Sequence, residues 1–102
     1  MQVLVVGAGP AGLTAARHVL PFLERDGNSL TVLEKSDKIG GIWNGEAESP
    51  VYRDLHTNLP KELMAFPDLE FEEESESYIH HSNVSKYLKQ YADKFQLQKV
   101  KY

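Results

Sequence analysis

Three glycines between a short apolar run and an alanine-rich stretch constrain the fold of this chain more than any other feature. The run Val3–Val6 is mostly β-branched and predicts a strand buried on both faces. The residues from Ala11 onward suit a helix, with a kink or an early break expected at Pro21. Leu30–Leu33 predicts a second buried strand. A strand, a helix and a parallel strand in about 34 residues have the size of a βαβ unit. The sequence therefore predicts an α/β fold.

The glycines have separate expected roles within this unit. Gly7 permits a tight turn after the strand, Gly9 lets a diphosphate approach the backbone, and Gly12 lets the helix lie close to the sheet. The first turn of the helix offers free N–H groups and a positive dipole end to the phosphates. Glu34 follows the second strand, where a carboxylate accepts hydrogen bonds from ribose hydroxyls and disfavours a 2′-phosphate. We expect an FAD or NAD site here, and not an NADP site.

Composition excludes several other classes. The 102 residues carry 11 basic and 15 acidic side chains, a net charge of −4, and form no basic stripe, so a nucleic-acid partner is not expected. The absence of cysteine excludes a disulfide framework, a thiolate metal site and a redox pair within this chain. The adjacent His80 and His81 do not predict a metal site, because neighbouring side chains point to different faces of a helix or strand.

A second glycine pair, Gly40-Gly41, precedes Ile42 and the single tryptophan, Trp43. A simple NAD-binding unit does not need this segment. A flavin extends beyond its diphosphate and needs backbone nearby with apolar walls. Taken alone, the segment favours a turn with a tryptophan packed in the core over a flavin contact.

The chain resembles the flavin-containing monooxygenases over its whole length. The motifs that carry this resemblance are Gly7-Ala8-Gly9-Pro10-Ala11-Gly12, Glu34, Gly40-Gly41-Ile42-Trp43, Thr57-Asn58-Leu59-Pro60-Lys61-Glu62, Met64 and Phe66-Pro67-Asp68. The part from Gly40 to Asp68 is the most specific, because many flavoproteins share the first glycine motif. The resemblance implies a Rossmann-like FAD-binding domain.

The resemblance also implies a mechanism. In that family NADPH reduces FAD, the reduced flavin and O2 form a C4a-hydroperoxide, and an oxygen atom passes to an amine nitrogen or a sulfide sulfur. Asn58 matches a family asparagine beside the flavin and the nicotinamide, and an amide there donates and accepts without carrying charge. The positions assigned to cofactor binding are Gly7, Ala8, Gly9, Pro10, Ala11, Gly12, Glu34, Lys35, Gly41, Ile42, Trp43, Thr57, Asn58 and Leu59.

The last third of the sequence predicts a helix and the start of a third parallel strand. Ser82 is the expected cap of this helix. Its expected buried stripe is Val84, Tyr87, Leu88, Tyr91, Ala92 and Phe95. Two or three strands with few helices leave one sheet face bare. We therefore expect residues 1–102 to be an incomplete N-terminal FAD-binding domain of a longer chain, inactive in isolation.

The expected partners are a small substrate that contains nitrogen or sulfur, and O2. The expected location is the cytoplasm or the cytosolic face of the endoplasmic reticulum, and the sequence does not decide membrane association. Two alternatives stay open. One is a reductase or amine oxidase that uses FAD and NAD(P)H. The other is an inactive fragment that only binds nucleotide, or that interacts through the acidic run of Glu70, Glu72, Glu73, Glu74 and Glu76.

Overall fold

The computed structural model describes residues 1–25, 27–46, 48–72, 76–97 and 100–101. Its elements, in chain order, are β1 (Gln2–Val6), α1 (Pro10–Glu24), β2 (Ser29–Leu33), the 3₁₀ turn η1 (Gly41–Trp43), α2 (Lys61–Met64), α3 (His81–Lys94) and β3 (Val100–Lys101). The strands form one parallel sheet in the order β1-β2-β3. The predicted βαβ unit, the later amphipathic helix and the third parallel strand are all confirmed.

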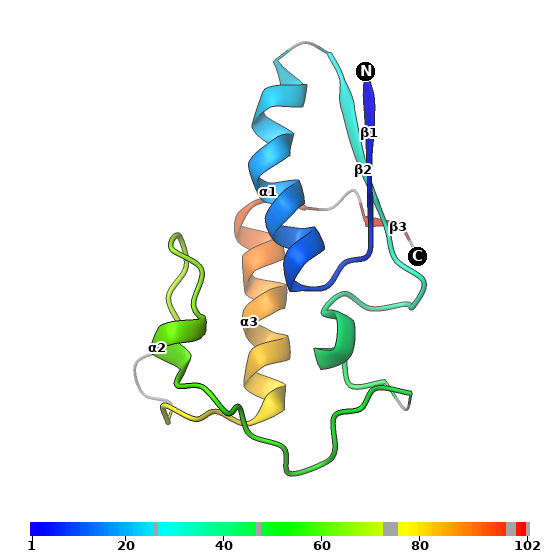
Figure 1. The fold of residues 1–102 in the computed structure, drawn as a ribbon. Helices are drawn as coiled ribbons and strands as arrows, with labels where there is room; N and C mark the ends of the chain where they lie inside the picture. Colours follow the sequence, from blue (N-terminus) through cyan, green and yellow to red (C-terminus); the bar gives the residue numbers. More distant parts are fainter. Residues whose placement is uncertain (26, 47, 73–75, 98–99, 102) are drawn as a thin grey trace.

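The helices α1 and α3 lie on the same side of the strands (Figure 1), and the guanidinium of Arg17 in α1 lies 4.1 Å from the ring centroid of Phe95 at the end of α3. Both connect parallel strands that follow one another across the sheet, and right-handed crossovers place such helices on the same face. The core lies between these layers. Its buried residues are Ala8, Leu13, Ala16, Leu20, Leu23, Leu30, Val32, Ile79, Val84, Tyr87, Leu88, Tyr91, Ala92 and Leu97.

The prediction that β1 is buried on both faces is wrong. Val3 and Val5 are half-buried toward the helices, whereas Leu4 is 56% exposed and Val6 is 80% exposed on the other face. Side chains alternate across a strand, and among the described residues no helix covers this second face. The expectation of one bare sheet face is therefore confirmed at β1.

Two local details of the helices also differ from the sequence-based expectation. A break or kink was expected at Pro21, but α1 continues through it to Glu24. Pro21 lies in the last turn, where burial of Leu20 and Leu23 on either side holds the helix to the core. The α3 helix begins at His81, and its cap is His80 rather than Ser82. The ring of His80 accepts from the backbone N–H of Ser82.

Within the described ranges, no helix has both the length and the apolar character that crossing a membrane requires.

Candidate functional site

The turn from β1 into α1 depends on two of the three glycines in the way the sequence predicts. Gly7 has a φ of +99°, a conformation that side chains disfavour, and its N–H donates to the carbonyl of Leu33 at 2.7 Å. A Cβ on Gly12 would lie 1.9 Å from the carbonyl oxygen of Gly7. Only glycine at this position lets the first turn of α1 lie against the end of β1.

Gly9 lies against the second glycine pair. A Cβ on Gly9 would point toward the backbone of Gly41, 3.5 Å from its Cα, and a Cβ on Gly41 would lie 3.1 Å from the Cα of Gly9. The N–H of Gly40 donates to the carbonyl of Ala8 at 2.8 Å. The two glycine segments therefore pack backbone against backbone. The sequence signal for this contact is the second glycine pair, Gly40-Gly41, although its spacing does not indicate that Gly9 is the partner.

Glu34 holds the glycine turn from the end of β2. One carboxylate oxygen accepts from the N–H of Ala8 at 2.9 Å, and the other accepts from the N–H of Ser36 at 2.8 Å. Burial by itself raises the pKa of Glu34. The backbone donors of Ser36 and Ala8, with the charge of Lys35, outweigh burial, so the pKa lies below its ordinary value. Each oxygen keeps a further lone pair, so the carboxylate can still accept from a ligand.

A cavity of about 590 Å³ opens beside this turn. Its lining is Val6, Gly7, Leu33, Glu34, Lys35, Ser36, Gly41, Ile42, Asn44, Glu46, Glu48, Ser49 and Pro50. The adjacent α1 helix has Gly9 as its N-cap, without a capping side chain, and no acidic residue in its first turn. Its first N–H groups are therefore not neutralised by the chain's own side chains, which is the arrangement that favours an anion.

The cavity brings together only part of the predicted site. Five predicted residues line it, namely Gly7, Glu34, Lys35, Gly41 and Ile42. Trp43 lines a separate cavity, of about 280 Å³, with His81 and Lys89 of α3. Thr57 is buried, while Asn58 and Leu59 are exposed. The hydroxyl of Thr57 donates to the carbonyl of Leu59 at 2.7 Å, so it bridges across Asn58.

The segment 53–59, which carries Asn58, is held by the approach to α3. The N–H of Thr57 donates to the carbonyl of Ile79 at 2.9 Å, and the N–H of His81 donates to the carbonyl of Leu55 at 3.0 Å. An isolated antiparallel bridge pairs His56 with His80. The position of Asn58 is therefore set by residues more than twenty positions later, and sequence analysis did not identify them.

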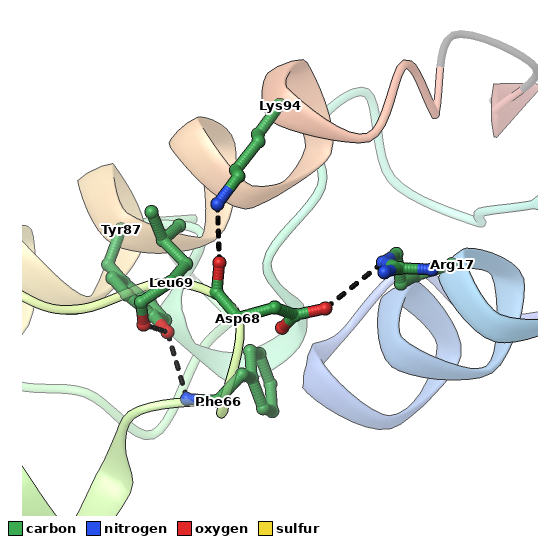
Figure 2. Close-up of polar contacts among 6 residues, drawn as sticks. All are labelled: Arg17, Phe66, Asp68, Leu69, Tyr87 and Lys94. Atoms are coloured by element: carbon green, nitrogen blue, oxygen red, sulfur yellow. Dashed lines mark hydrogen bonds and ion pairs between the residues drawn. The ribbon is translucent and has the colours of Figure 1, made fainter.

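The segment after α2 is fixed by side chains of both long helices (Figure 2). Asp68 forms an ion pair with Arg17 of α1 at 3.0 Å, and its carbonyl accepts from the ammonium of Lys94. The hydroxyl of Tyr87 donates to the carbonyl of Leu69 at 2.6 Å and accepts from the N–H of Phe66 at 2.9 Å. Burial raises the pKa of Tyr87, so this hydroxyl stays protonated as a donor. Phe66 and Asp68 were recognised as motif residues, but their partners were not.

Comparisons with known proteins agree with this geometry. The sequence profile of the flavin-binding monooxygenase-like family matches residues 1–102. The chain is 36% identical over 122 aligned residues to flavin-containing monooxygenase FMO GS-OX2 of Arabidopsis thaliana, covering 97% of this chain and 26% of that protein. It is 33% identical over 96 residues to flavin-containing monooxygenase 3 of Rattus norvegicus, covering 89% of this chain and 17% of that protein.

Solved structures give the same result. The S-allyl-L-cysteine S-oxygenase of Allium sativum superposes with a TM-score of 0.78 at 30% identity, over 98% of this chain and 27% of that one. Tmm from Pelagibacter superposes with a TM-score of 0.82 at 27% identity, over 99% of this chain and 27% of that one. The chain thus spans between about a sixth and about a quarter of the length of these relatives. With a matching profile over every residue and the Rossmann-like α/β fold of its structural neighbours, the chain belongs to the flavin-binding monooxygenase-like family.

Proposed function

We propose that residues 1–102 form the N-terminal FAD-binding part of a longer monooxygenase that uses NADPH and O2 to oxygenate an amine nitrogen or a sulfide sulfur. The cavity beside the uncapped N-terminus of α1, with Glu34 in its wall, is the observation that carries this proposal. We place the protein in the cytoplasm or on the cytosolic face of the endoplasmic reticulum.

The residues present fit the diphosphate and ribose of FAD. Gly7 gives the turn its shape without a side chain in the cavity, and the first N–H groups of α1 are positioned to bind the diphosphate. Glu34 holds Ala8 and retains lone pairs for the ribose hydroxyls, and its negative charge disfavours a 2′-phosphate. NADP therefore requires a second site, in the longer chain.

Further along the cavity, Lys35 and Gly41 with Ile42 would hold the rest of the cofactor. When bound, the flavin supplies hydride acceptance from NADPH and activation of O2 for transfer of one oxygen atom. Asn58 would orient groups on the reacting side, because an amide donates and accepts hydrogen bonds without gaining or losing a proton near neutral pH. Trp43 would contribute an apolar wall from η1, and Thr57 and Leu59 would shape the turn around Asn58.

The names of the relatives support the chemical class. The Allium protein is an S-oxygenase of S-allyl-L-cysteine, and the Arabidopsis and rat proteins are flavin-containing monooxygenases. We extend this to a soft nucleophilic atom, nitrogen or sulfur, in the substrate of the present protein.

The test is made on the full-length protein purified with its flavin. NADPH oxidation is measured together with N-oxide or S-oxide formed and H2O2 released, for a panel of tertiary amines and sulfides. We expect product in proportion to the NADPH consumed. Consumption of NADPH that yields only H2O2 with every amine and sulfide would contradict the monooxygenase assignment and favour a reductase.

Asn58→Ala sharpens this test. We expect flavin to remain bound and the oxygenated product per NADPH to fall about tenfold, as for loss of one ordinary hydrogen bond of about 1.4 kcal/mol. Asn83→Ala, at an exposed position on α3, is the matched control. Equal coupling in the two variants would remove Asn58 from the site.

A further inference from the structure

The exposed segment that carries Asn58 depends on one carbonyl group that two histidines share. The carbonyl oxygen of Arg53 lies 2.8 Å from Nε2 of His80 and 3.0 Å from Nε2 of His81. Both rings therefore donate to the same acceptor, at the start of the segment 53–59. The bridge between His56 and His80 fixes the segment a few residues later.

The hydrogen bonds of His80 allow only one neutral tautomer. Its Nδ1 lies 3.2 Å from the backbone nitrogen of Ser82 and 2.8 Å from the Ser82 hydroxyl. A backbone N–H is only a donor, so Nδ1 is the acceptor and the ring proton lies on Nε2. The same ring thus caps α3 through Nδ1 and holds Arg53 through Nε2.

The rings of two other histidines surround that of His80. The ring centroid of His81 lies 4.1 Å from that of His80, and the ring centroid of His56 lies 5.4 Å away, edge-on. The ring of His80 is therefore held between α3 and the segment 53–59.

The segment itself contributes main-chain acceptors. Arg53 offers its carbonyl to the two rings, and the carbonyl oxygen of Asp54 lies 2.9 Å from Nδ1 of His56.

We propose that His80 is the positioning residue for the segment 53–59, because one ring caps α3 through Nδ1 and holds the Arg53 carbonyl through Nε2. We call these two contacts the clamp, and both are made by described residues. Its consequence for oxygen transfer rests on the proposed function, because it acts through the position of Asn58.

The test compares amide hydrogen exchange at Thr57 with that at Leu88 in the full-length protein. Thr57 donates across the clamp, and Leu88 is buried in the middle of α3. His80→Asn is the variant of choice, because asparagine preserves an N-cap acceptor but is too short to reach Arg53. We expect protection of Thr57 to fall about tenfold in His80→Asn, as for loss of one or two hydrogen bonds, with Leu88 unchanged.

The second measurement uses another histidine as the control. His18→Asn, at an exposed histidine of α1, should leave the protection of Thr57 unchanged. Unchanged protection of Thr57 in His80→Asn would overturn the proposal, as would an equal loss at Leu88.

Turnover gives the third measurement. His80→Asn should release more H2O2 per NADPH than the unmodified protein at pH 8, with unchanged flavin content. A looser segment with unaltered coupling would overturn the positioning role. Failure of the proposed function would be recognised separately, as absence of oxygenated product in the unmodified protein, while the exchange results would still decide the clamp.

Discussion

The glycine turn and the Asn58 segment are two parts of the candidate site that are held in opposite ways. The turn is held by main chain, since Gly12 lies under the carbonyl of Gly7 and Gly41 packs against Gly9. The Asn58 segment is held by backbone hydrogen bonds and by side chains from distant positions, with His80 at its start. In the glycine turn, we expect the structure to be damaged by substitutions that add a side chain. In the Asn58 segment, we expect it to be damaged by substitutions that remove one.

The largest expected effect tests the first half of this comparison. Gly12→Ala places a Cβ 1.9 Å from the Gly7 carbonyl oxygen, so either α1 or β1 must shift. We expect a loss of about 3 kcal/mol in the free energy of unfolding, although alanine usually stabilises a helix interior. Denaturant unfolding followed by circular dichroism measures this loss.

Gly9→Ala is the matched control, because its Cβ would lie at an ordinary contact distance of 3.5 Å from Gly41. It should fold with nearly unchanged stability. Equal losses in the two variants would break the distinction between these glycines.

The second prediction concerns Glu34, whose side chain holds the main chain of the glycine turn. Glu34→Gln turns one acceptor into an NH₂ donor facing a backbone N–H, either of Ala8 or of Ser36. We expect a loss of about 2 kcal/mol at neutral pH, the cost of one unsatisfied buried donor.

The pH dependence of this loss follows from the lowered pKa of Glu34. Its stabilising contribution is fully present above the ordinary value of 4.5 and is lost as the pH falls through the lower folded value. The stability of the unmodified chain and of Glu34→Gln should therefore converge below pH 4.5. A constant difference across that range would exclude an ionised Glu34 as the cause.

The third prediction tests the side-chain half of the comparison. Tyr87→Phe leaves the N–H of Phe66 and the carbonyl of Leu69 without their partner. We expect a loss of about 1.5 kcal/mol in the free energy of unfolding.

Tyr91→Phe is its control on the same helix. The buried hydroxyl of Tyr91 lies near that of Thr14 but makes no hydrogen bond among the described residues, because the Thr14 hydroxyl donates instead to the carbonyl of Pro10 at 2.6 Å. Its removal should leave thermal stability unchanged or slightly raised. If both variants lost the same stability, the hydrogen bonds of Tyr87 would not be the cause.

The smallest effect is expected at the ion pair. The side chains of Arg17 and Asp68 are 27% and 28% exposed, so solvent screens their interaction. Asp68→Asn should cost about 0.5 kcal/mol in low salt and less in high salt. If Asp68→Asn lost as much stability as Tyr87→Phe, the ion pair would hold the segment after α2 as strongly as the Tyr87 hydroxyl does.

Sequence alone determined the parts of this protein that depend on neighbouring residues. Apolar periodicity gave the strands and α3, and glycine spacing with Glu34 gave the βαβ unit and its turn, because these patterns act within a few residues or across one crossover. The start of β3 was visible as alternation, and the bare sheet face followed from the small number of helices.

Tertiary structure decided what depends on residues far apart. It paired Gly9 with Gly41, placed Trp43 against α3, and gave the Asn58 segment its anchor at His80. In the tertiary structure α1 also continues through Pro21, and Leu4 and Val6 are exposed. The physical reason is that such contacts join groups whose distance in space has no fixed relation to their separation along the chain, so no local pattern specifies which of them meet.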